Sequence, residues 1–254
     1  MFMTRIISIS NRKGGSGKTT TAVNVSAALA HRGKSVLIID ADPQAHTTLS
    51  FGIRQRDVHE DLYSVLAEGK CPQEVMAHTY VERLKIIPAT RRLHDYERSY
   101  ARNKDSRLIL SKQLAGLNGD FDYLVIDTPP TLSLLTVSSL IASEEVYIPM
   151  QTHFLCLEGL AEMIGVVRKI RAAYGTRLAI KGIIPTFYKE RTRLSKMILQ
   201  DIAKNLGRRI ILHPVRVNIS LAEAPSFGKT IFQYNMNSNG ARDYLAVAQQ
   251  IESL

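Results

Sequence analysis

A glycine-rich segment near the N-terminus constrains the fold of this chain more than any other feature. Residues 13–20 read KGGSGKTT, and they lie between an apolar β-branched run, Ile6–Ser10, and a helical pattern, Thr19–His31. Glycines at a strand-to-helix turn let backbone N–H groups approach an anion that the positive end of the helix also attracts. The pattern therefore predicts a P-loop, the phosphate-binding turn of a βαβ unit.

The loop also suggests roles for individual side chains. Lys18 is expected to reach the β- and γ-phosphates of a nucleotide, and the Thr19 hydroxyl to bind Mg²⁺. Arg12 stands where the usual pattern has its first glycine, and Lys13 adds a second lysine ahead of the glycines. This deviant form is more restrictive than the general motif. The residues expected to contact the nucleotide are Lys13, Gly14, Gly15, Ser16, Gly17, Lys18, Thr19 and Thr20.

Short apolar runs alternate with longer helical patterns along the chain. The runs are apolar almost throughout, which is typical of parallel strands covered on both faces. The expected strands are Ile6–Ser10, Val36–Asp40, Leu84–Pro88, Tyr123–Asp127, Glu145–Pro149 and Ala179–Ile184, and the expected helices include Thr19–His31, Ser106–Leu117, Leu157–Tyr174 and Leu194–Leu206. The sequence predicts an α/β fold with a doubly wound, mostly parallel sheet and helices on both faces. Only the segment from about Phe51 to Arg83 is less regular.

Carboxylates end two of these runs. The run Val36–Asp40 ends in DADPQ, which places Asp40 and Asp42 at the carboxyl edge of the sheet beside the P-loop. The run YLVID ends at Asp127. An aspartate that ends an apolar strand after a P-loop is expected at the Walker B position, close to Mg²⁺.

The composition is that of a soluble globular protein, with 45% apolar and 22% charged residues. No repeat or Pro/Gly-rich linker divides the chain, so residues 1–254 are expected to form one domain. No apolar run approaches the roughly 18–20 residues of a membrane span, and the N-terminal run is too short for a secretory signal. A cytoplasmic protein is therefore expected. Cys71 and Cys156 lie far apart without ligand-like spacing, which favours two reduced thiols.

The net charge of +10 is distributed unevenly. Residues 151–254 contain 15 Lys and Arg against 7 Asp and Glu, and residues 168–216 contain 13 against 2. Such an asymmetry predicts a polyanionic partner for the C-terminal half, most commonly nucleic acid. A solvated basic face without a partner is the alternative.

Taken together, these motifs resemble the ParA/MinD group of deviant Walker ATPases, and within it the ParA/Soj partition ATPases. The resemblance rests on NRKGGSGKTTTAVNVSAALA, VLIIDADPQAHTT, YLVIDTPPTLSLLT and SLAEAPSFGKTIFQYN. The last stretch is the discriminating one, because it is similar to the EAPS-G-K-I segment of partition ATPases. Residues 51–120 match less distinctively.

The resemblance implies a slow ATPase that uses ATP and Mg²⁺ and forms a nucleotide-sandwich homodimer. Lys13 would reach across to phosphates held by the other subunit, and Lys18 and Asp42 would complete the catalytic set. Asp42 matches the residue that positions the attacking water. Thr19 would bind Mg²⁺ directly, with Asp40 and Asp127 around it.

The resemblance further implies that the ATP-bound dimer binds double-stranded DNA non-specifically and is associated with the nucleoid. A ParB-like or cargo-adaptor protein and DNA would stimulate hydrolysis, and the function would be chromosome or plasmid partition. No helix-turn-helix, zinc finger or N-terminal DNA-binding extension is visible, so operator binding is not expected. The basic residues expected to contact DNA are Arg191, Arg193, Lys196, Lys204, Arg208, Arg209 and Arg216.

Four alternatives stay open. The same ATPase could position protein cargo such as carboxysomes or chemoreceptor arrays. A MinD-like ATPase would bind lipid through a basic C-terminal amphipathic helix, but the last twelve residues contain no Lys or Arg. An iron-protein of the nitrogenase type would need a cysteine soon after Asp127, and the stretch that follows, TPPTLSLLTVSSL, has none. A metabolic ligase would need room for a second substrate domain, and 254 residues leave little. We therefore expect no membrane partner, and the C-terminal apolar residues Tyr244, Leu245, Val247 and Ile251 are expected to dock on the core.

Overall fold

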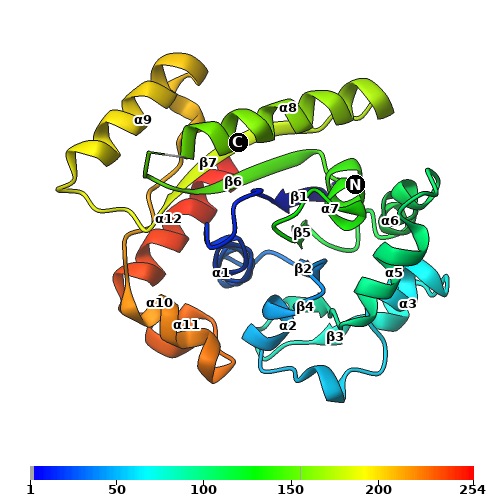
Figure 1. The fold of residues 1–254 in the computed structure, drawn as a ribbon. Coiled ribbons are helices and arrows are strands. Elements are labelled where there is room, and N and C mark those ends of the chain that lie inside the picture. The colour runs from blue at the N-terminus through cyan, green and yellow to red at the C-terminus, as the bar shows by residue number, and fades with distance from the viewer. Residues whose placement is uncertain (1–2, 155) are drawn as a thin grey trace.

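A seven-stranded sheet forms the centre of the molecule (Figure 1). The structure, a computed structural model, describes residues 3–154 and 156–254. In this part of the chain the strand order is β3-β4-β2-β5-β1-β6-β7, and neighbouring strands are parallel except for β3 and β4. The strands are β1 (Arg5–Ile9), β2 (Val36–Asp40), β3 (Ala77–His78), β4 (Leu84–Ile87), β5 (Tyr123–Asp127), β6 (Glu145–Gln151) and β7 (Ala179–Thr186). The predicted fold class is confirmed.

Helices cover both faces of the sheet. They are α1 (Lys18–His31), α2 (His46–Ser50), α3 (Leu62–Ala67), α4 (Pro72–Val75), α5 (Arg92–Tyr100), α6 (Ser106–Ala115), α7 (Leu134–Ala142), α8 (Cys156–Tyr174), α9 (Arg193–Leu206), α10 (Ile219–Glu223), α11 (Ile231–Asn235) and α12 (Asn239–Ser253). Short 3₁₀ turns form η1 (Gln55–Asp57), η2 (Arg208–Ile210) and η3 (Ala224–Phe227). In Figure 1, α1 and α12 lie on one side of the strands, and α5 and α6 lie on the other.

Alternate residues of the central strands enter different hydrophobic clusters. Val36 and Ile38 pack in the cluster that includes residues of α1, α11 and α12, whereas Leu37 and Ile39 pack in the cluster with α3, α5, α6 and α7. A third cluster joins β6 and β7 to α8 and α9. Because a strand points successive side chains to opposite faces, burial on both faces explains why these strands are apolar throughout.

The C-terminal helix α12 docks on the core, as the sequence predicted. Tyr244, Val247 and Ile251 are buried, and Leu245 packs partly against the same cluster. Two hydrogen bonds of 2.8 Å join Arg5 to the Glu145 carboxylate, and a third of 2.8 Å joins it to the Ile251 carbonyl. No described helix is long and apolar enough to cross a membrane.

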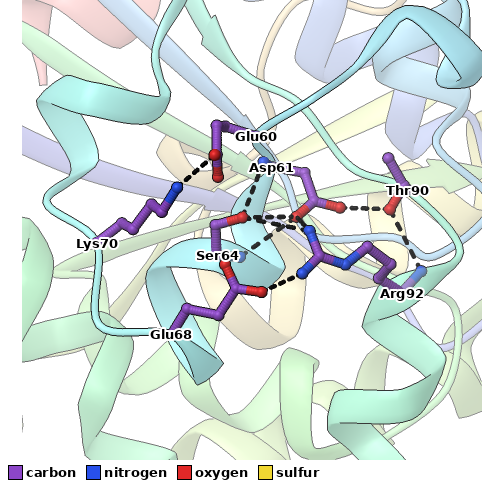
Figure 2. Close-up of polar contacts among 7 residues, drawn as sticks. All are labelled: Glu60, Asp61, Ser64, Glu68, Lys70, Thr90 and Arg92. Atoms are coloured by element: carbon purple, nitrogen blue, oxygen red, sulfur yellow. Dashed lines mark hydrogen bonds and ion pairs between the residues drawn. The ribbon is translucent and has the colours of Figure 1, made fainter.

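A buried carboxylate organises the irregular segment after α2, which contains η1, α3, α4 and β3. Asp61 is 1% exposed and caps the N-terminus of α3 by accepting a hydrogen bond of 3.3 Å from Ser64 N. It also accepts hydrogen bonds from Thr90 and Arg92, and Arg92 forms an ion pair with Glu68 (Figure 2). This cluster fastens α3 to the loop between β4 and α5.

Candidate nucleotide-binding site

The loop between β1 and α1 has the backbone shape that its glycines predict. Gly15 and Gly17 have φ angles of 71° and 87°, a region that residues with side chains rarely adopt. The Gln151 side chain donates a hydrogen bond of 2.6 Å to the Gly15 carbonyl, and the Thr186 hydroxyl donates one of 2.8 Å to the Ser16 carbonyl. The ends of β6 and β7 therefore fix the loop at the N-terminus of α1, where the helix favours an anion.

Lys18 is the buried cation of this loop, with 7% of its surface exposed. Its Nζ donates a hydrogen bond of 3.3 Å to the Lys13 carbonyl. Burial lowers the pKa of Lys18, and the carboxylates of Asp127 and Asp42 oppose that shift. A buried ammonium group beside the helix N-terminus suits the charge of a phosphate chain.

The Walker B carboxylate lies beside the helix start, as predicted. Asp127 Oδ2 accepts hydrogen bonds of 2.8 Å from both the Thr19 and the Thr47 hydroxyls. Its Oδ1 is buried and has no hydrogen-bond partner in the described part of the chain. Burial raises the pKa of Asp127 to about 6. A buried, unpartnered carboxylate oxygen next to a threonine hydroxyl is a donor set that fits Mg²⁺, which takes one or two protein ligands together with phosphate oxygens.

Asp40 lies opposite Asp127, because the two residues are paired in the β2–β5 register. Its Oδ2 accepts hydrogen bonds from the backbone N and the hydroxyl of Thr48, at 2.8 and 2.7 Å. Burial, and secondarily the Asp127 charge, raises the pKa of Asp40 to about 8. Asp42 is also buried, and its Oδ1 accepts a hydrogen bond of 2.9 Å from Gln44 N. The structure thus brings all three predicted aspartates to the edge beside the P-loop.

Lys13 lies on the exposed side of the loop. Its Nζ is 2.7 Å from His153 Nε2, and the neighbouring Arg12 forms an ion pair of 3.0 Å with Glu162. A hollow of about 550 Å³ is lined by Arg12, Lys13, Pro130, Thr131, Leu132, Glu158, Gly159 and Glu162. Phe154 is 82% exposed. Lys13 therefore faces outward, away from the buried position of Lys18.

The chain is similar to known proteins over almost its whole length. A sequence-family profile described as an AAA domain matches residues 4–180. The sporulation initiation inhibitor protein Soj of Bacillus subtilis is 37% identical over 249 residues, which cover 98% of each chain. The chromosome partitioning protein ParA of Caulobacter vibrioides is 35% identical over 252 residues, which cover 98% of this chain and 94% of that one.

The chain belongs to the ParA/Soj family of partition ATPases.

A solved structure of a metabolic synthase shares the fold of this ParA/Soj-family chain. The cobyrinic acid a,c-diamide synthase of Mycobacterium smegmatis, with bound ATP analog and magnesium, is 29% identical and has a TM-score of 0.83. The match covers 97% of this chain and 93% of that one. Length alone therefore does not separate partition ATPases from metabolic ligases. The identity to Soj and ParA, at 37% and 35%, is higher than the identity to this synthase.

Sequence reasoning missed an apolar hollow of about 310 Å³ that begins at Gly17 and Thr20 of this ParA/Soj-type loop. Much of the rest of its lining comes from residues 211–221, which we call the wall segment and of which residues 215–219 and Leu221 line the hollow. Apolar residues occur at every second position in part of this segment, Val215, Val217, Ile219 and Leu221, but Ile219 and Leu221 lie in helix α10, so this period of two is not the signal of a strand. The described residues lining the hollow also include Thr186, Phe187, Arg216, Asn218, Ala222 and Tyr244.

The seven basic residues expected to contact DNA differ in their surroundings. Six of them are exposed along the loop before α9, on α9 itself and on η2: Arg191, Arg193, Lys196, Lys204, Arg208 and Arg209. Arg216 is instead half-buried and bonded to Asp243, with 2.6 Å between Nη2 and Oδ1. DNA contact by all seven residues stays a prediction, and the bond to Asp243 gives Arg216 a second, structural role.

Proposed function

We propose that this chain is an ATP-dependent dimerising switch that binds DNA non-specifically in its ATP state and serves chromosome or plasmid partition. The observation that supports it most is the Asp127 site at the P-loop, where a buried carboxylate oxygen without a hydrogen-bond partner among the described residues lies beside the Thr19 hydroxyl. Membership in the ParA/Soj family agrees with this proposal.

The site's residues divide the work of binding MgATP. The P-loop backbone and Lys18 would hold the phosphates, and Thr19, Asp127 and Asp40 would hold Mg²⁺. Bound Mg²⁺ would neutralise negative charge on the phosphates. The apolar hollow continues from Gly17 and Thr20, so it would take the nucleoside half of ATP.

Hydrolysis would depend on Asp42 and Lys13. Asp42 is buried, its charge acts on Lys18, and the Gln44 N–H donates to one of its oxygens, so its carboxylate would orient the attacking water. Lys13 lies on the exposed side of the loop, where it would reach the phosphates of a second copy of this chain and stabilise developing charge there. The homodimer would therefore be the form that hydrolyses ATP.

The six exposed basic residues around α9 would contact DNA phosphates, and a dimer would double their number. A ParB-like or cargo-adaptor protein would stimulate the slow hydrolysis, and the protein would be cytoplasmic and associated with the nucleoid. Positioning of protein cargo on the nucleoid is the second candidate. We do not propose MinD-like membrane cycling, because the apolar face of α12 is buried in the core.

Light scattering of the purified protein with ATP, ADP or no nucleotide tests dimerisation, and a phosphate-release assay measures ATP turnover. Wild type should dimerise with ATP and turn over ATP below roughly 10 s⁻¹, the median for enzymes. Asp42→Ala should dimerise without hydrolysis, Lys13→Ala should bind ATP but stay monomeric, and Lys18→Ala should bind ATP weakly. A wild type that stays monomeric with ATP would contradict the proposal, as would wild-type turnover by Lys13→Ala.

A further inference from the structure

The wall segment, residues 211–221, is held on one side by β7. Leu212 N donates a hydrogen bond of 2.9 Å to the Ile183 carbonyl, and Val215 N donates one of 2.7 Å to the Pro185 carbonyl. Tyr188 N in turn donates a bond of 3.0 Å to the Val215 carbonyl. The first part of the segment therefore runs beside the end of β7 without forming a regular strand, and its last residues begin helix α10 at Ile219. Its opposite side faces α12.

The buried carboxylate of Asp243 on α12 holds that opposite side, together with Gln250 Oε1, which accepts a hydrogen bond of 2.6 Å from His213 N. Asp243 Oδ2 accepts hydrogen bonds of 3.0 Å from Arg216 N and from Arg216 Nε, and Oδ1 accepts one of 2.6 Å from Arg216 Nη2. His213 Nε2 lies 3.3 Å from the same Oδ1. Burial works to raise the pKa of Asp243, but its hydrogen bonds with Arg216 outweigh burial and lower it.

Two further contacts link α12 to the same hollow. A Cβ at Gly240 would lie 2.7 Å from Leu221 Cγ, so only glycine lets the wall segment approach the helix this closely. The Tyr244 hydroxyl lies 3.1 Å from Thr21 Oγ1, two residues after Thr19 on α1. Helix α12 therefore contacts the wall segment and the P-loop helix at once.

We propose that Asp243 is a positioning residue for nucleotide binding. By holding both the backbone and the guanidinium group of Arg216, it sets how far the wall segment stands from the P-loop, and hence the width of the hollow. A two-point pair of this kind fixes orientation as well as distance. This inference rests on the proposed function, in which the hollow holds the nucleoside half of ATP.

The pair can be tested separately from the fold, because the chain offers a matched control. Arg5 and Glu145 also form a bidentate ion pair, and Arg5 connects it to α12 by a hydrogen bond to the Ile251 carbonyl. That pair lies where β1 and β6 begin, whereas the P-loop lies where β1 ends. Glu145→Gln should therefore lower the melting temperature without changing nucleotide affinity.

We expect Asp243→Asn and Arg216→Met each to raise the KM for ATP and the Kd for a fluorescent ATP analogue about tenfold. The kcat per folded molecule should stay within about twofold of the wild-type value. Arg216 is partly exposed, so Arg216→Met guards against a folding failure in Asp243→Asn. The double variant should lose no more affinity than either single variant, because both remove one interaction.

Wild-type KM in both single variants would overturn the positioning role and leave the proposed function intact. An equal rise of KM in Glu145→Gln would also overturn it, because a general loss of stability would then explain the effect. A wild-type chain that binds no ATP would overturn the proposed function, and this inference with it.

Discussion

The Thr19 hydroxyl donates a hydrogen bond of 2.8 Å to Asp127 Oδ2, which joins the first turn of α1 to the end of β5. Thr47 donates to the same oxygen over the same distance from α2. The second oxygen of Asp127 is buried without a partner in the described part of the chain. These two threonines share one acceptor, but only Thr19 belongs to the P-loop motif.

Thr19→Val should abolish the increase in ATP affinity that Mg²⁺ produces, since it removes the proposed metal ligand. Thr47→Val is the matched control, and it should keep that increase although it loses an equivalent hydrogen bond. Titration with an ATP analogue in Mg²⁺ and in EDTA measures both, with about a tenfold or greater loss expected for Thr19→Val. An undiminished Mg²⁺ effect in Thr19→Val would rule out its role as a ligand.

The contact between Lys13 and His153 predicts a titration shift. Burial, together with the nearby Lys13 charge, lowers the pKa of His153 below its ordinary value. Lys13→Ala should therefore raise the His153 pKa toward about 6.5, the ordinary value of histidine. A pH series of the imidazole NMR signals checks this. An unchanged pKa in Lys13→Ala would mean that Lys13 does not rest against His153 in the monomer.

The raised pKa of Asp40 predicts that the stability of the nucleotide-free and metal-free protein depends on pH. Burial, and then the Asp127 charge, raises its pKa from 3.8 to about 8. Between these values the folded state binds more protons than the unfolded state, so the free energy of unfolding falls as pH rises. Asp40→Asn should remove part of that fall, and urea unfolding from pH 5 to 9 measures it. Parallel profiles for wild type and variant would contradict the prediction.

The parts of the site that depend on local sequence were predictable. The P-loop is contiguous, and Asp40 and Asp127 end strands whose carboxyl ends meet at one edge of a parallel sheet. The wall segment was not predictable, because its place depends on contacts with β7 and α12 that no local pattern reports. Arg216 shows the limit of charge counting: residue counts contain no information about its buried partner, Asp243. The Asp61 cluster was missed for the same reason, since Thr90 and Arg92 lie far along the chain (Figure 2).

Binding to random-sequence duplex DNA shows whether ATP switches this chain onto DNA. The protein would be measured with ATP, with ADP and without nucleotide over a salt series, alongside Lys196→Glu/Lys204→Glu on α9 and the control Lys112→Glu on α6. We predict tight binding only with ATP, a steep loss of affinity as salt increases, and weaker binding for the α9 variant but not for the α6 control. Equal binding in all three nucleotide states, or none in any state, would contradict the claim that ATP switches this chain onto DNA.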